Sequence, residues 1–127
     1  MTDTDAPKMP ASQLALRFGL EMLALVGLVL GGRELIDGRA GQAVGIIVAV
    51  AAAAAWGTFN VPGDPSRSGR APVPVSGVVR LCVEFDVLAF GAAGWMLATP
   101  LVGVVFIGAT AFHYGATRQR VRWLINR

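Results

Sequence analysis

Cysteine, histidine and charge are all scarce in this sequence. Its 127 residues include one cysteine, Cys82, and one histidine, and only 15% of them are charged. A single cysteine forms no disulfide within the chain and supplies no thiolate cluster for zinc or iron–sulfur binding. We therefore expect neither a metal nor a redox cofactor, and we expect Cys82 to be a small buried packing residue.

Apolar side chains take the place of the missing charge. They make up 54% of the residues, whereas soluble domains have roughly 45–50% apolar and about 25% charged residues. A water-soluble domain of this length would not bury so many apolar groups, so the lipid bilayer is the expected solvent. The formal net charge of +3 follows the membrane topology described below, and no nucleic-acid partner is indicated.

Four apolar windows approach the ~20 residues that a membrane-spanning helix needs. They are residues 14–32, 40–59, 75–99 and 101–117, and the second and fourth contain no Asp, Glu, Lys or Arg. Pro100 separates the last two windows, because proline disfavours helix just before it and removes a backbone donor. The sequence therefore predicts an all-α integral membrane four-helix bundle with a tight hairpin at Pro100.

Three segments lie outside these windows. Residues 1–13 lack the basic region of a signal peptide and predict a disordered cytoplasmic tail. Residues 60–76 hold four prolines and two glycines, which is typical of a loop joining two helix pairs. Residues 118–127 form a basic tail, expected to lie as a helix on the inner leaflet with its arginines toward headgroups and with apolar residues toward acyl chains, namely Val121, Trp123, Leu124 and Ile125.

The basic residues are distributed unevenly between the two sides. The opposite side has only Arg33 and Arg39, whereas the side of the termini and the 60–76 loop carries Lys8, Arg17, Arg67, Arg70, Arg80, Arg118, Arg120, Arg122 and Arg127. The positive-inside rule then places both termini in the cytoplasm. We expect a multi-pass protein of the inner membrane.

A charged motif occurs twice, 63 residues apart. Arg17 and Glu21 in the first window match Arg80 and Glu84 in the third, and in each pair the two residues share one helix face. This register favours a duplicated two-helix unit, repeated in parallel.

These charges have two interpretations. The first is structural: each Arg–Glu pair is an ion pair at the membrane interface that lowers the cost of placing charges where the helix enters the membrane. Arginine can extend to the headgroups, and glutamate is favoured near a helix N-terminus. Ionisable residues inside a span are also functional candidates. We predict one shallow polar pocket facing the cytoplasm, with Glu21, Glu84 and His113 as candidate catalytic residues and with candidate ligand-binding residues at the same depth, namely Arg17, Arg80, Trp56 and Asn60.

Four stretches carry a family resemblance. "LRFGLEMLAL", "WGTFNVP", "RLCVEFDVLAFG" and "FHYGATRQRVRWLI" resemble the small YrdB-like bacterial membrane proteins, a domain of unknown function. The resemblance runs from about Ala15 to Ile125, and the Trp-Gly-x-Phe-x-x-Pro element is its most specific part. It implies a four-span inner-membrane protein and brings no established activity.

Three functions follow from these observations. We favour a noncatalytic accessory or lipid-binding module whose partners are the bilayer and a lipid or hydrophobic small molecule. The alternative is a small membrane enzyme that uses Glu21 and Glu84 as acid and base, assisted by His113, on a lipid or isoprenoid substrate. A proton-coupled transporter ranks third, because the far parts of the spans hold no ionisable residue, and it would require a homo-oligomer with a central glutamate pair.

Overall fold

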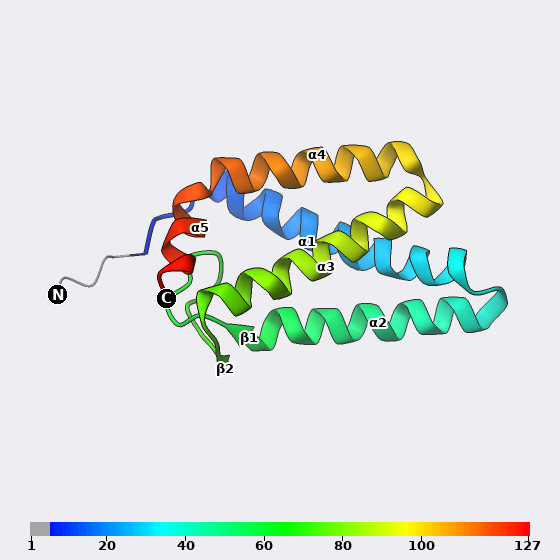
Figure 1. Cartoon of the computed structure of the whole chain (residues 1–127), viewed down its shortest axis with the longest axis horizontal. Helices are drawn as coiled ribbons and strands as arrows, with labels where there is room; N and C mark the ends of the chain where they lie inside the picture. The colour runs from blue at the N-terminus through cyan, green and yellow to red at the C-terminus, as the bar shows by residue number, and fades with distance from the viewer. Residues whose placement is uncertain (1–5) are drawn as a thin grey trace.

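The structure, a computed structural model that describes residues 6–127, is mainly helical (Figure 1). Part of the expected N-terminal tail, residues 1–5, lies outside the described residues. The elements in chain order are α1 (Ala11–Leu35), α2 (Gly38–Thr58), β1 (Phe59–Asn60), β2 (Val73–Pro74), α3 (Gly77–Ala98), α4 (Pro100–Ala116) and α5 (Arg118–Ile125). The four long helices run back and forth, so that α1 and α3 start from the same end of the molecule.

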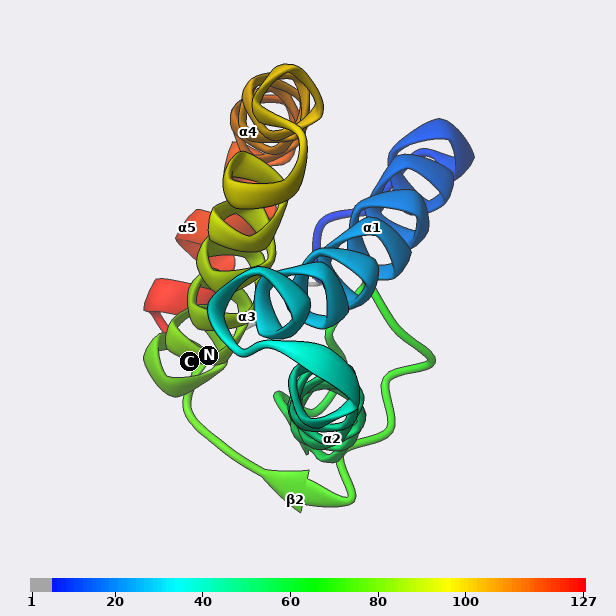
Figure 2. The ribbon, with the colours of Figure 1, turned by 90° about the vertical axis from the view of Figure 1, so that its right-hand side faces the viewer.

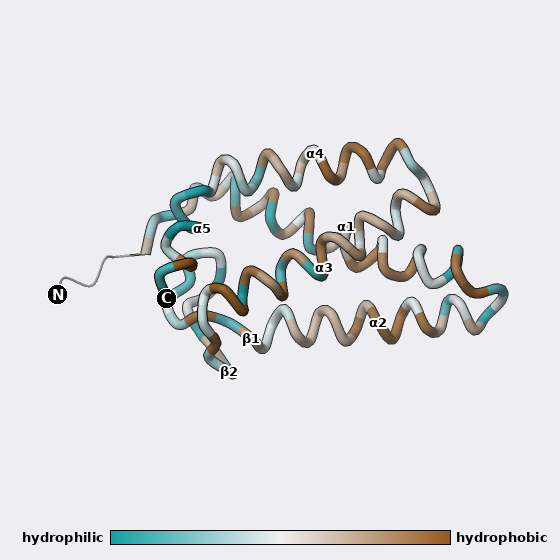
Figure 3. The backbone as a smooth tube through the Cα atoms, in the orientation of Figure 1, coloured by the Kyte–Doolittle hydropathy of each residue, from teal (hydrophilic) through white to brown (hydrophobic). Residues whose placement is uncertain are grey.

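Three of the described helices are long and apolar enough to cross a membrane. They are α1, α2 and α3, and a fourth span is present if α4 is counted together with α5 despite a bend of 70° between them. Figure 3 shows polar residues in the α1–α2 turn and, at the opposite end of the molecule, in the loop, α5 and the first halves of α1 and α3, with mainly apolar residues between these two regions. These helices therefore have the length and the apolar composition that are expected of a multi-pass membrane protein.

Local sequence signals explain where the helices begin. Pro100 is the first residue of α4, a position where its missing N–H costs nothing. Ser76 caps α3, because its side-chain oxygen accepts a hydrogen bond from the Val79 N–H at 3.3 Å. Gly38 has a φ of 73° and permits the sharp reversal between α1 and α2.

The 60–76 loop is more ordered than its prolines predict. β1 and β2 pair in parallel, with Phe59 opposite Val73 and Asn60 opposite Pro74. The loop is thereby held against the C-terminal end of α2.

Glycines let α1 approach α3 closely. A Cβ atom at Gly94 would overlap the carbonyl oxygen of Gly27, and one at Gly91 would lie 2.7 Å from the Cα atom of Ala24. The core beside this contact contains Leu20, Ala24, Trp56, Val87, Leu88, Ala92 and Phe106. Close backbone contact through small residues is typical of helices packed in membranes.

Two expectations from the sequence are wrong. Cys82 is exposed rather than buried, since it lies on the outward face of α3. α5 does not turn all its arginines outward and its apolar residues toward lipid: Arg120 and Leu124 are 1% and 0% exposed. α5 instead folds back onto the start of α3, where Gly77 touches the backbone of Leu124.

Candidate functional site: a buried arginine cluster

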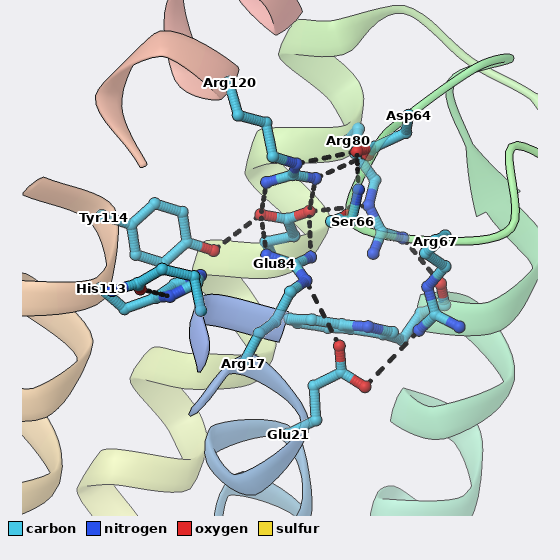
Figure 4. Close-up of polar contacts among 12 residues, drawn as sticks. Arg17, Glu21, Asp64, Ser66, Arg67, Arg80, Glu84, His113, Tyr114 and Arg120 are labelled. Atoms are coloured by element: carbon cyan, nitrogen blue, oxygen red, sulfur yellow. Dashed lines mark hydrogen bonds and ion pairs between the residues drawn. The ribbon is translucent and has the colours of Figure 1, made fainter. Parts of the chain in front are cut away.

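One carboxylate, that of Glu84 in α3, collects donors from four helices (Figure 4). Its oxygens accept hydrogen bonds from Arg17 Nη2 at 2.6 Å, Arg80 Nε at 2.9 Å, Arg120 Nη2 at 2.6 Å and Tyr114 Oη at 2.6 Å. The Glu84 side chain is 0% exposed. We call Glu84 and these four donors, together with Asp64, the arginine cluster.

Asp64 supplies the second buried carboxylate of the cluster. Arg120 donates to it from two nitrogens, Nε to Oδ1 at 2.8 Å and Nη2 to Oδ2 at 2.6 Å, and the Ser66 N–H donates to Oδ1 at 2.9 Å. Burial raises the pKa of the Asp64 carboxyl, but the Arg120 guanidinium and the Ser66 donor lower it by more, so that the pKa lies below its ordinary value of 3.8. Arg120 therefore links the 60–76 loop to α3, because it pairs with Asp64 in the loop and with Glu84 in α3.

Arg80 joins the cluster to the end of α2. Its Nη1 donates to the carbonyl oxygens of Trp56 at 2.7 Å and Phe59 at 2.8 Å, which satisfies acceptors left unpaired at a helix C-terminus. The Trp56 ring centroid lies 4.9 Å from the guanidinium carbon of Arg80 and 5.0 Å from that of Arg17. Two cation–π contacts therefore hold this indole ring beside the cluster.

Glu21 lies at the edge of the cluster. It is 3.4 Å from Arg17 Nε and 3.7 Å from Arg67 Nη2, and its side chain is 17% exposed. Glu84, its counterpart in the repeated motif, is at the centre instead. The two halves of the repeat therefore have different surroundings.

The structure brings some of the predicted site residues together and separates others. Arg17, Arg80 and Glu84 meet in the cluster. Trp56 packs against it and Glu21 borders it. His113 lies beside the cluster, with its ring centroid 5.4 Å from that of Tyr114, and its Nδ1 contacts Gln13 at 3.0 Å. Asn60 donates to the Gly57 carbonyl at 2.7 Å, and both side chains are about 1% exposed.

Four contributing residues were not predicted from the sequence. Tyr114 follows His113 directly and reaches Glu84, while Asp64, Arg67 and Arg120 come from the loop and the C-terminal tail. No motif or spacing marks these long-range partners. Within residues 6–127, the His, Cys, Asp and Glu side chains form no group of three or more that would suit a metal ion.

The chemistry available to Glu84 follows from its neighbours. Oε1 faces nitrogens of three arginines, and Oε2 faces Tyr114 Oη at 2.6 Å and Arg120 Nη1 at 3.2 Å. Both oxygens are therefore already occupied by donors. Such a carboxylate suits an electrostatic anchor.

The helices and this polar cluster define the class, a small α-helical protein with the features of a multi-pass membrane protein. The chain belongs to the family described as "Protein of unknown function (DUF2568)", whose model matches residues 15–111. It is 32% identical over 121 residues to "Uncharacterized protein YrdB" of Bacillus subtilis (strain 168), covering 94% of this chain and 98% of that protein. The resemblance to the YrdB-like proteins is confirmed. No solved structure matches the chain.

Proposed function

We propose that this chain is a noncatalytic accessory or lipid-binding module of the bacterial inner membrane. In this proposal α1 to α4 are four spans of one helix bundle, and both termini and the 60–76 loop lie in the cytoplasm. The observation that carries the proposal is the occupation of both oxygens of the buried Glu84 carboxylate by donors of the protein. The repeated Arg–Glu motif then serves to fasten helix ends together.

The enzyme alternative is less well supported by this geometry. A general acid or base must come within hydrogen-bond reach of its substrate, and Glu84 is wholly enclosed by the protein. Glu21 is more accessible, but its neighbours are two arginines. His113 contacts neither of the two glutamates in the hydrogen bonds of its ring.

The transporter alternative also lacks support. The arginine cluster lies at one end of the helices, and the polar residues at the other end are in the turn that contains Arg33, Glu34, Asp37 and Arg39. Between these ends, residues 22–32 of α1, 40–58 of α2, 87–98 of α3 and all of α4 hold no Asp, Glu, Lys or Arg. A transported ion would have no charged side chains to follow between the two sides.

The test compares Glu84→Gln with Asp86→Asn, which removes a charge from an exposed position of the same helix. We expect Glu84→Gln to lower the free energy of unfolding by about 3–5 kcal/mol, because three buried arginines lose the charge that balances them. Asp86→Asn should change it by less than about 0.5 kcal/mol. Thermal unfolding in mild detergent, with native mass spectrometry of each sample, measures both stability and bound molecules.

A milder variant keeps the test informative if Glu84→Gln does not fold. Tyr114→Phe removes one donor from the Glu84 carboxylate and should cost about 1.5–3 kcal/mol. The structural role of Glu84 is refuted if either variant unfolds like the wild type yet loses a molecule that the wild type retains. Glu84 would then belong to a binding or catalytic site.

A further inference from the structure

A groove opens where α1 and α2 diverge. At their far end, Gly32 meets the backbone at Gly41 and Gly45, so the two helices touch there. Toward the 60–76 loop α1 leans away from α2, as Figures 1 and 2 show from two directions. Two cavities, of about 300 and 320 Å³, lie at this diverging end.

The two cavities adjoin and differ in character. Both are lined by Phe18, Glu21 and Arg67. One of them continues between the helices along Met22, Leu25, Ala53 and Val87. The other opens at the loop beside Arg17, Ser66 and Ser68. Together they form an amphipathic groove, which we call the α1–α2 groove, with a charged mouth and an apolar inner part.

Several buried donors around this groove have no hydrogen-bond partner. They include Ser66 Oγ and Arg67 Nε at the mouth and Trp56 Nε1 on the wall, and Trp56 is 5% exposed. Native proteins pair nearly all such groups, because an unpaired buried donor is costly. A ligand that offers acceptors only, such as a phosphate, complements this set.

The charges around the mouth also favour an anion. Of the charged residues, Arg17, Arg67 and Glu21 line the cavities. They belong to a network of ion pairs that leaves one positive charge in excess, since it joins four arginines to three carboxylates, namely Arg17, Arg67, Arg80 and Arg120 to Glu21, Asp64 and Glu84. Arg67 is the least engaged of the four, since its contact with Glu21 is 3.7 Å long and its side chain is 28% exposed. Arg67 is therefore free to turn to a phosphate oxygen while Glu21 stays beside Arg17.

We propose that the α1–α2 groove binds one anionic phospholipid of the cytoplasmic leaflet. Its phosphate lies between Ser66 and Arg67, and one acyl chain runs inward along Met22, Ala53 and Val87. This inference rests on the proposed function, since it requires the loop to lie at the level of the lipid headgroups. It gives that function a lipid class and a location.

The experiment offers the purified protein an equal mixture of phosphatidylglycerol and phosphatidylcholine with the same acyl chains. Native mass spectrometry counts the lipids retained. Arg67→Gln removes the phosphate donor, and Arg70→Gln is its control, because Arg70 is exposed in the same loop and lines neither cavity. Ala53→Phe fills the inner part, and Ala54→Phe places the same ring at the next residue, which lines neither cavity.

The proposal predicts one phosphatidylglycerol on the wild type in preference to phosphatidylcholine. Arg67→Gln should weaken its retention about fivefold or more, Ala53→Phe should abolish it, and the two control variants should bind as the wild type does. The thermal unfolding of each variant is also measured without lipid, and the melting temperature of Arg67→Gln should lie within a few degrees of that of the wild type.

Two other outcomes overturn the inference, with different consequences. In the first, the wild type retains both lipids equally and Ala53→Phe retains as much lipid as the wild type. The groove is then not the binding site, but the protein is still a lipid-binding module. If the wild type retains no lipid at all, the lipid-binding part of the proposed function fails with the inference. The stability of Glu84→Gln still tests the structural role of the cluster separately.

Discussion

Asp64 is a loop residue that has the surroundings of a core residue. It is 1% exposed and is paired through both oxygens with Arg120, which is equally buried. Because Arg120 also holds Glu84, removal of Asp64 loosens the loop, α5 and the centre of the cluster together. We expect Asp64→Asn to cost about 3 kcal/mol of stability at neutral pH.

The pH dependence of this loss has a definite sign. The pKa of Asp64 is lowered in the folded protein relative to its ordinary value of 3.8, so its charge stabilises the fold above that pH. The stabilisation declines as the pH falls below 3.8 and vanishes below the lowered pKa. The difference in melting temperature between the wild type and Asp64→Asn should therefore be constant from pH 7 to 5 and should shrink at pH 3. An equal difference at pH 7 and pH 3 would show that the Asp64 charge is not the cause.

Sequence patterns predicted only the local part of this network. Arg80 and Glu84 share a helix face and do form an ion pair at 2.9 Å, and Arg17 and Glu21 lie within 3.4 Å. The contact of Arg17 with Glu84 joins residues 67 positions apart. Helical periodicity carries no information about such a partner, because it depends on how two helices pack side by side.

At the scale of elements, the contact between α1 and α3 sets the geometry of the cluster. Arg17 reaches Glu84 because glycines allow the two helix backbones to touch, and Gly94 lies directly against the Gly27 carbonyl. We expect Gly94→Ala to cost about 1–3 kcal/mol, since the added methyl group must push the helices apart.

The control for this prediction is Gly19→Ala. A Cβ atom at Gly19 would meet nothing within 4 Å, so the substitution should leave stability unchanged or raise it by up to about 1 kcal/mol through helix propensity. Thermal unfolding of both variants in the same detergent provides the comparison. Equal melting temperatures for Gly94→Ala and the wild type would mean that the helices are not in contact at this point.

The elements themselves were more predictable than their contacts. Long apolar runs and Pro100 indicate the helices and the break before α4, because these depend on composition and on the chemistry of a single residue. The position of α5 was not predictable in this way. Its alternating arginines and apolar residues suit a membrane surface, and the two buried carboxylates that attract Arg120 come from α3 and the 60–76 loop.

At the scale of the whole molecule, the main prediction concerns which helices cross the membrane and in which direction. α1, α2 and α3 each have the length and apolar character of a span, whereas α4 has them only when it is counted together with α5. The large apolar side chains on the outer surface, such as Phe90 and Leu101 at 67% and 74% exposure, would be covered by lipid. In the proposed orientation, the cluster would lie at the level of the cytoplasmic headgroups, where the basic residues gather.

Single cysteines in a Cys82→Ser background measure this arrangement. A membrane-impermeant maleimide applied to spheroplasts should label an Asp37→Cys variant at once, because the turn between α1 and α2 faces outward in the proposed orientation. Ser68→Cys, in the 60–76 loop, and Asn126→Cys, after α5, should be labelled only after the membrane is permeabilised. Labelling of Asn126→Cys in intact spheroplasts while Ser68→Cys stays protected would mean that α4 does not cross, which leaves three spans. Labelling of Ser68→Cys there, with protection of Asp37→Cys, would reverse the orientation and place the α1–α2 groove in the outer leaflet.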